Sequence, residues 1–281
     1  MRLSAVTADV LVDQRTKLAA EKYNRATPGS THSLLEEGQQ PRAFTRSAST
    51  VNRYMEVLSH VFTVARKEWR WNLAGNPCSD ISKLREDNGR TRFLSDDERK
   101  RLLAVTAKDH ALHVLVSLAL ATAARAGELV GLTWADVDLR QKDARLLFRI
   151  TKNAQPRTVW VHGDVLRLLR AHHKRRDEDV GAVFPGRVDK DGKAGRYDYI
   201  KPFNEAAKAA GIEAFRFHDL RHSAATYLAM LGATEQQLRA IGGWKSGVVS
   251  RYVHLAAEDA KDAMEALSNK LDGKKGKGQR T

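Results

Sequence analysis

The sequence predicts a mainly α-helical protein with a small antiparallel sheet, divided into two domains. Over most of the chain, apolar residues recur every three to four positions, which is the spacing of an amphipathic helix. Two short runs, residues 145–151 and 157–162, are instead rich in β-branched and aromatic residues, and the five residues between them suit a hairpin loop. A length of 281 residues fits two domains, and the polar segment 80–92 is the expected linker.

The N-terminal part is expected to hold two helices, over residues 1–24 and about 51–71. Residues 25–48 are rich in Pro, Gly, Ser and Thr, and predict a long loop between them. Ser49 and Thr50 are candidate caps for the second helix. Its spacing predicts one buried face, made of Tyr54, Val57, Leu58, Val61, Phe62, Ala65 and Trp69. The other face is expected to carry Arg53, Arg66, Lys67 and Arg70.

The C-terminal part is expected to hold most of the elements. Ser95 and Glu98 form an S-x-x-E capping box that begins a helix toward Ala107. The nearly all-apolar segment 111–124 predicts a helix in a domain core, and a short helix begins at Glu128. Residues 185–201 are rich in turn formers. Further helices are expected over residues 165–173, 202–210, 217–231, 234–241 and 257–271, before a basic tail that is expected to be disordered.

The charge balance points to a polyanionic partner. Lys and Arg number 48 against 34 Asp and Glu, a net charge of +14. Nucleic acid is favoured over a membrane surface, because mean hydropathy is −0.49 and the longest apolar stretch is too short to span a bilayer. The one cysteine, Cys78, excludes an intramolecular disulfide framework and a zinc site made of cysteines alone. The N-terminus lacks the apolar core of a signal peptide. A reducing cytoplasm is the expected compartment for a chain with one cysteine.

One reaction, the cleavage of a phosphodiester, could use four basic side chains, a tryptophan and a tyrosine of this sequence together. Taken singly, each is the kind of residue found on a surface or in a core. Together, two arginines can neutralise a phosphodiester in its transition state, and a tyrosine can form a covalent phosphoenzyme. A lysine can protonate the departing 5′-oxygen, and a histidine can act as a base, so neither a metal nor another cofactor is needed. The set is Arg125, Lys152, His218, Arg221, Trp244 and Tyr252.

Two alternatives compete for residues of this set. His218 and His222 have the i, i+4 spacing of two zinc ligands, but Arg221 would put a positive charge beside the ion, which disfavours a metal. Tyr227 is the competing nucleophile. It follows His218 by nine residues on the same predicted helix and is expected to pack in the core.

The residues stand in the order that is found in the tyrosine recombinase, or phage integrase, family. The segments ARAGELVGLTWADVD, HDLRHSAATYLAMLGA and GGWKS…RYVHL resemble its three sequence boxes, and the likeness extends over about residues 49–268. The resemblance implies a helical, SAM-like core-binding domain at residues 1–88, truncated at its N-terminus. The net charge of +14 and the basic helix face predict that Arg53, Arg66, Lys67 and Arg70 contact DNA phosphates. The resemblance also implies an α+β catalytic domain at residues 89–271, with residues 272–281 as the tail.

The same resemblance implies a role for each site residue. Tyr252 is the nucleophile, Arg125 and Arg221 bind the scissile phosphate, Lys152 is the general acid and His218 assists proton transfer. Trp244 fills a position that many relatives give to histidine, and Glu128 supports the first arginine. The implied enzyme is a site-specific recombinase of a mobile element that acts on double-stranded DNA. It works through a 3′-phosphotyrosine, as a homotetramer on DNA that exchanges its last helix between protomers, and as a monomer when free.

Two other functions are compatible with this chemistry. One is a DNA-binding protein derived from an integrase that no longer recombines. The interval of eight residues from Trp244 to Tyr252, one shorter than in most of the family, favours it. The other is strand relaxation of the type IB topoisomerase kind. Covalent trapping on DNA and plasmid relaxation would separate the three.

Overall fold

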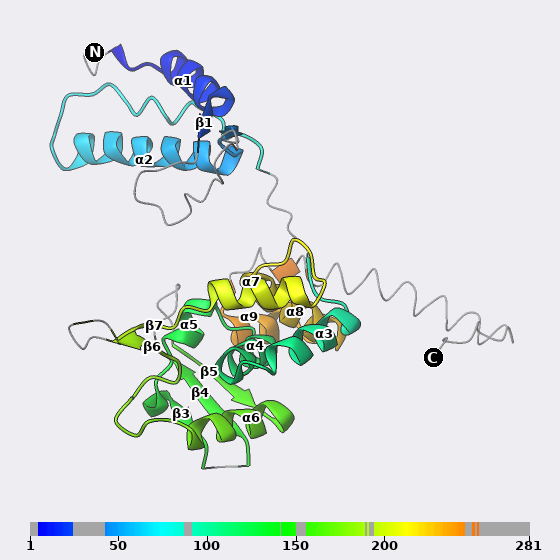
Figure 1. The fold of residues 1–281 in the computed structure, drawn as a ribbon. Helices are drawn as coiled ribbons and strands as arrows, with labels where there is room; N and C mark the ends of the chain where they lie inside the picture. Colours follow the sequence, from blue (N-terminus) through cyan, green and yellow to red (C-terminus); the bar gives the residue numbers. More distant parts are fainter. Residues whose placement is uncertain are drawn as a thin grey trace, which may run out of the picture. The chain divides into compact units, whose positions relative to one another are not determined.

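The computed structural model describes residues 5–24, 43–86, 92–140, 142–149, 156–188, 190, 194–244, 249, 250 and 252. The chain divides into two compact units, Met1–Arg90 and Thr91–Thr281 (Figure 1). Both are built mainly of helices, and every sheet in the described residues is small and antiparallel. The predicted fold class is therefore confirmed. No helix in these ranges is both long enough and apolar enough to cross a bilayer.

The first unit contains two helices and a short strand pair. Helix α1 (Ala8–Ala20) is followed by strand β1 (Lys22–Asn24), which pairs with β2 (Ala43–Thr45), and α2 (Ala48–Lys67) packs against α1. The side chain of Ser47 caps α2 by accepting from the Thr50 N–H, so the helix begins before the candidate caps at 49 and 50. Buried Asn52 exchanges two hydrogen bonds of 2.9 Å with the backbone of Leu84. These bonds fix the segment around Leu84, which follows α2 in the chain, to that helix.

The predicted buried face of α2 is partly wrong. Phe62 and Ala65 are buried, but Tyr54, Val57 and Val61 are 49%, 65% and 46% exposed. The apolar residues span two adjacent sides of the helix, and the core takes the side that also contains Val51. Trp69 lies beyond the last helical residue and is 53% exposed.

The four basic residues assigned to DNA do not form one helix face. All four are exposed. At 3.6 residues per turn, however, Arg66 lies about 140° around the helix from Arg53. Arg70 lies beyond α2, with a left-handed backbone (φ 56°). The prediction that all four residues share one helix face is therefore wrong.

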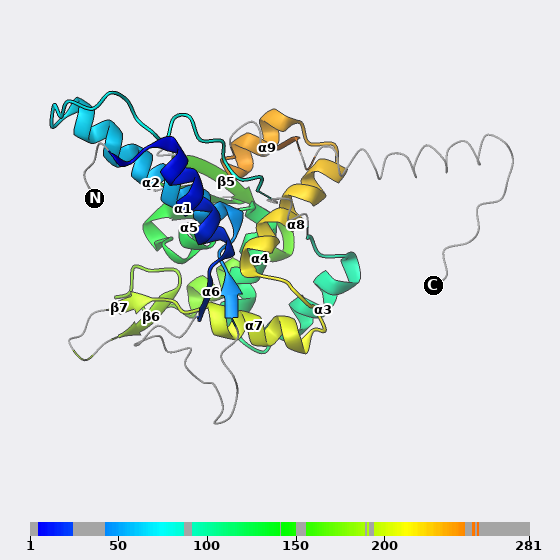
Figure 2. The ribbon, with the colours of Figure 1, turned by 90° about the horizontal axis from the view of Figure 1, so that it is seen from above.

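The second unit surrounds a central apolar helix. Helix α4 (His110–Thr122) contacts α3 (Asp96–Thr106), α6 (Gly163–Lys174) and α8 (Phe217–Met230), and α8 runs beside it in both views (Figures 1 and 2). Leu115 and Leu118 of α4 are fully buried, as expected for a nearly all-apolar helix. Further helices of this unit are α5 (Ala126–Val130), α7 (Ile200–Ala209), α9 (Glu235–Gly242) and a 3-10 turn, η2 (Trp134–Asp136).

A three-stranded antiparallel sheet lies in the same unit. Its order is β3 (Val137–Asp138), β4 (Ala144–Phe148) and β5 (Arg157–Val161), with Phe148 opposite Arg157 at the loop end of the predicted hairpin. Strands β6 (Pro185–Val188) and β7 (Ala194–Arg196) form a second hairpin inside the segment predicted as turns. The helix predicted over 257–271 and the tail lie outside the described residues.

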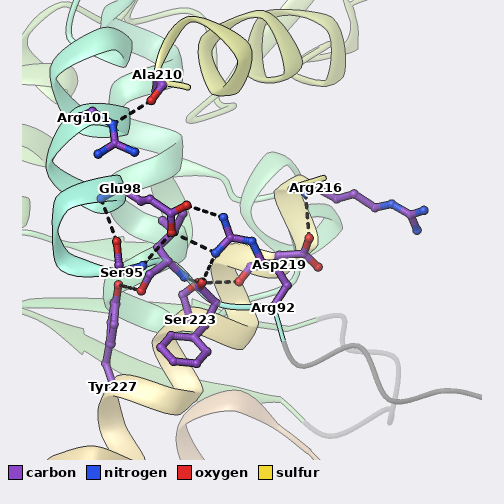
Figure 3. Close-up of polar contacts among 11 residues, drawn as sticks. Arg92, Ser95, Glu98, Arg101, Ala210, Arg216, Asp219, Ser223 and Tyr227 are labelled. Carbon is purple, nitrogen blue, oxygen red and sulfur yellow. Dashed lines mark hydrogen bonds and ion pairs between the residues drawn. The ribbon is translucent and has the colours of Figure 1, made fainter. Parts of the chain in front are cut away.

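Helix α8 is held against the segment that precedes α3 (Figure 3). Ser223 accepts from the Leu94 N–H at 2.9 Å, and the Tyr227 hydroxyl donates to the Leu94 carbonyl at 2.7 Å. The predicted capping box of Ser95 and Glu98 is present at the start of α3. These contacts fix the helix that carries two candidate site residues, His218 and Arg221.

Candidate active site

Helix α8 presents its candidate residues near its N-terminal end. His218 is exposed, whereas Arg221, one turn later, is only 2% exposed. Asp219 accepts from the Arg216 N–H at 2.8 Å and so caps the first turn. The sequence therefore sets both the start of the helix and the side on which the histidine and the arginine lie.

The guanidinium of Arg221 is held by backbone and by an aromatic ring. Its Nη1 donates to the Ala123 carbonyl at 2.6 Å, at the left-handed residue (φ 51°) that ends α4. Its Cζ lies 4.1 Å from the ring centroid of Trp244, a cation–π contact. Burial, with the positive charge of Arg125 nearby, lowers the pKa of Arg221 to about 9. Its Nη2 is buried without a hydrogen-bond partner among the described residues.

Arg125 lies directly before α5 and is paired with Glu128 on that helix. Its Nη1 donates to Glu128 Oε1 at 2.8 Å, and its backbone N–H donates to Glu128 Oε2 at 2.8 Å. Its Nη2 donates to the Gly243 carbonyl at 3.2 Å. The guanidinium has five N–H donors, so these contacts leave several for a ligand. The side chain remains 22% exposed, in contrast to the buried Glu128.

A third arginine, which the sequence reasoning did not single out, completes this cluster. Arg157, the first residue of β5, binds Glu128 with both terminal nitrogens, at 2.9 and 2.7 Å. Its side chain is 8% exposed, and its Nε donates to the Ile241 carbonyl at 2.9 Å. Burial acts to raise the pKa of Glu128, but the hydrogen bonds from Arg157 and Arg125 outweigh it and lower that pKa.

Two glycines at the end of α9, Gly242 and Gly243, determine the position of Trp244. Gly243 has a left-handed backbone (φ 65°), which ends α9 and turns its carbonyl to Arg125. A side chain at Gly242 would lie within 2.0 Å of the Trp244 ring, so the indole needs the bare backbone there. Trp244 is 9% exposed and covers the guanidinium of Arg221.

Tyr252 is buried in the same cluster. It is 2% exposed, and its ring lies 5.5 Å from that of Trp244. Its hydroxyl lies 2.5 Å from Nδ1 of His222, which the sequence analysis considered as a metal ligand alone. The His218 and His222 rings meet edge to face at 5.1 Å. Within the described ranges, no three side chains of the His, Cys, Asp and Glu types form a possible metal site.

The remaining two predictions for the site have different outcomes. Lys152 lies outside the described residues. Tyr227 directs its hydroxyl to the Leu94 carbonyl, as described above, and burial raises its pKa. The competing tyrosine therefore helps to hold α8 against the segment that precedes α3.

The cluster as a whole is suited to binding an anion beside a phenol. The guanidinium groups of Arg125 and Arg157 bind the single carboxylate of Glu128. The charge of Arg221 also acts on that carboxylate and on Tyr252, so positive charge is in excess in this cluster. Planar guanidinium groups match the oxygens of a phosphate, and desolvation strengthens such pairing.

The chain is similar to known recombinases. A family model described as the phage integrase family matches residues 92–259. The integrase of Salmonella phage P22 is 27% identical over 266 residues, which cover 91% of this chain and 67% of that integrase. The shufflon-specific DNA recombinase of Escherichia coli is 32% identical over 219 residues, which cover 75% of this chain and 52% of that recombinase.

Solved structures share the fold. A post-cleavage complex of the XerH site-specific recombinase with a palindromic difH substrate has a TM-score of 0.68 at 18% identity, and the match covers 95% of this chain and 74% of XerH. The Tn1549 transposon integrase in complex with circular intermediate DNA has a TM-score of 0.62 at 18% identity, with 90% and 82% covered.

Proposed function

The chain belongs to the phage integrase family of tyrosine recombinases, and we propose that it breaks and rejoins double-stranded DNA at specific sites through a 3′-phosphotyrosine intermediate. The observation that carries this proposal is the burial of the Tyr252 hydroxyl in one cluster with Arg221 and Trp244. A nucleophile and the cations that activate its target are then neighbours before DNA arrives.

The proposed reaction begins with attack of the Tyr252 oxygen on the scissile phosphorus. The bond to the 5′-oxygen breaks, and that oxygen takes a proton from Lys152. Arg125 and Arg221 neutralise the charge that develops on the non-bridging oxygens. Attack by the 5′-hydroxyl of another strand then reverses the chemistry, releases Tyr252 and joins the strands. No metal or other cofactor enters this scheme.

The proton of Tyr252 requires an acceptor. The family resemblance assigns proton transfer to His218, and the contact of 2.5 Å adds His222 as the group that holds the hydroxyl in the free protein. An ordinary tyrosine has a pKa of about 10, so the hydroxyl needs such a neighbour to react near neutral pH.

The proposed partner is double-stranded DNA. A net charge of +14 supports it, as do the complexes of XerH and Tn1549 integrase with DNA. We infer a homotetramer on DNA, a monomer when free, and a cytoplasmic location. Residues 255–271, outside the described ranges, remain the predicted element of exchange between protomers.

Covalent trapping tests the proposal. A duplex is built from the direct repeat that flanks the element, with a nick close to the cleaved phosphate, so that the short leaving strand diffuses away. The wild type should form an adduct that resists SDS, and Tyr252→Phe should bind equally well and form none. DNA binding without an adduct would instead identify a protein that no longer recombines. Relaxation of plasmids without site preference would identify a topoisomerase.

A further inference from the structure

We propose that Arg157 is a positioning residue of this active site, which orients Glu128 and thereby sets the direction and the effective charge of Arg125. The inference rests on the proposed function, because the arginine that it acts through is the one assigned to the scissile phosphate. Arg157 itself is buried and makes its contacts within the protein.

The first support is the saturation of the carboxylate. Oxygen Oε1 of Glu128 accepts from Nη1 of both Arg125 and Arg157, at 2.8 and 2.9 Å. Oxygen Oε2 accepts from the Arg125 backbone and from Nη2 of Arg157, at 2.8 and 2.7 Å. With four hydrogen bonds, Glu128 has one available orientation, and the side chain of Arg125 is held by one of the four.

The second support is the charge balance. Glu128 carries one negative charge, and it is shared between two guanidinium groups, so the trio keeps a net charge of +1. Without Arg157, the same buried carboxylate would pair with Arg125 alone and cancel its charge. Because opposite charges attract strongly where water is excluded, Arg125 would then be turned toward Glu128 and away from a phosphate.

The third support is the position of Arg157 between distant segments. Its guanidinium stacks 4.7 Å from the ring centroid of Phe148, at the loop end of the hairpin, and Nε binds the Ile241 carbonyl at the end of α9. Arg125 binds the Gly243 carbonyl two residues further on. Arg157 therefore joins the hairpin of β4 and β5, the Glu128 helix and the turn before Trp244.

A residue that only stabilises the fold would lower cleavage of every substrate alike. A residue that preserves positive charge to bind the phosphate would matter less when the scissile phosphate carries no negative charge. The test substrate is the nicked duplex with a methyl group in place of one non-bridging oxygen at the scissile phosphorus, which removes the negative charge. The rate of adduct formation is measured in single turnover with saturating protein, on this duplex and on the ordinary phosphodiester duplex.

Arg157→Met should slow adduct formation on the phosphodiester by roughly tenfold to a hundredfold, by analogy with the loss of the hydrogen-bond partner that orients a metal ligand. On the methylphosphonate the loss should be several-fold smaller. Arg157→Lys keeps a positive charge but loses the forked guanidinium, so its rate of adduct formation should fall between those of the wild type and Arg157→Met. If circular dichroism shows that Arg157→Met is unfolded, Arg157→Lys is used for the test instead.

The double variant that combines Arg157→Met with Glu128→Gln provides the decisive test. Glu128→Gln removes the charge that Arg157 is proposed to share, so the double variant should cleave faster than Arg157→Met alone. The matched control is Arg92→Met, which breaks the bidentate pair with Glu98 outside the site. It should slow both substrates by the same factor.

Equal losses for Arg157→Met on both substrates, or a double variant slower than both single variants, would overturn the positioning role. A selective loss in the Arg92→Met control would overturn it as well. Failure of the wild type to form any adduct would instead refute the proposed function, so the two failures are distinguishable.

Discussion

The hydroxyl of Tyr227 is predicted to stabilise the fold and to take no part in the chemistry. In Tyr227→Phe the ring stays and the hydrogen bond of 2.7 Å to the Leu94 carbonyl is lost. A hydrogen bond of this kind contributes about 0.5–1.5 kcal/mol to the free energy of unfolding. For a unit of this size, a loss of about 1 kcal/mol lowers the melting temperature by roughly 2–4 °C.

Ser223→Ala is the companion variant, because it removes the partner of the Leu94 N–H. Leu94 and Ser223 are both fully buried, so the N–H would be left unpaired away from water. That loss costs about 1–3 kcal/mol, and the melting temperature should fall further than in Tyr227→Phe. The two losses share Leu94, so the double variant should depart from additivity.

Thermal unfolding by circular dichroism measures both variants, and the nicked duplex measures their chemistry at a temperature below either transition. Both should form the covalent adduct at close to the wild-type level. The reasoning is refuted if Tyr227→Phe melts as the wild type does, or if it remains folded and forms no adduct, since Tyr227 would then be a nucleophile.

Three further outcomes follow from the charges and the site. The logarithm of DNA affinity should fall with the logarithm of salt concentration, at roughly −0.9 per phosphate contacted, and titration by fluorescence anisotropy at several salt concentrations would expose a flat dependence that contradicts extensive phosphate contact. Adduct formation should persist in EDTA, whereas stoichiometric zinc in the purified protein with activity lost on chelation would support ligation by His218 and His222. Hydrogen bonding to Arg92 lowers the pKa of Glu98 from 4.5 to about 2, so this pair adds stability above pH 4.5 that is lost as the pH falls toward 2. Arg92→Met should therefore cost more free energy of unfolding at pH 6 than at pH 3.5, and an equal cost in urea titrations at both values would show that the pair is uncoupled from this carboxyl.

Local signals in the sequence predicted local structure well. Both hydrogen bonds of the capping box join Ser95 and Glu98, which lie within one helical turn. A pattern of four residues is therefore enough to predict it. The nearly all-apolar stretch at 111–124 predicted a core helix, and most of α4 is buried at the centre of its unit. In α2, by contrast, apolar residues occupy two adjacent sides, and the choice between them depends on which segments pack there.

The site shows the same division. The support of Arg125 by Glu128 was implied by the family resemblance, and the two residues are only three positions apart. Arg157 reaches Glu128 from 29 residues away, through the register of a hairpin, and nothing distinguishes it in sequence from the many other basic residues. The contact between His222 and Tyr252 joins positions 30 residues apart and depends on the turn at Gly243, so the spacing within α8 suggested a metal pair instead.

Peptide mapping of the trapped adduct tests the central claim most directly. The wild-type protein is cleaved with the nicked duplex, digested with a protease and a nuclease, and the peptide that retains a nucleotide is sequenced by mass spectrometry. The account predicts a 3′-phosphodiester on the oxygen of Tyr252. A nucleotide attached to Tyr227, or to any residue other than Tyr252, would contradict it.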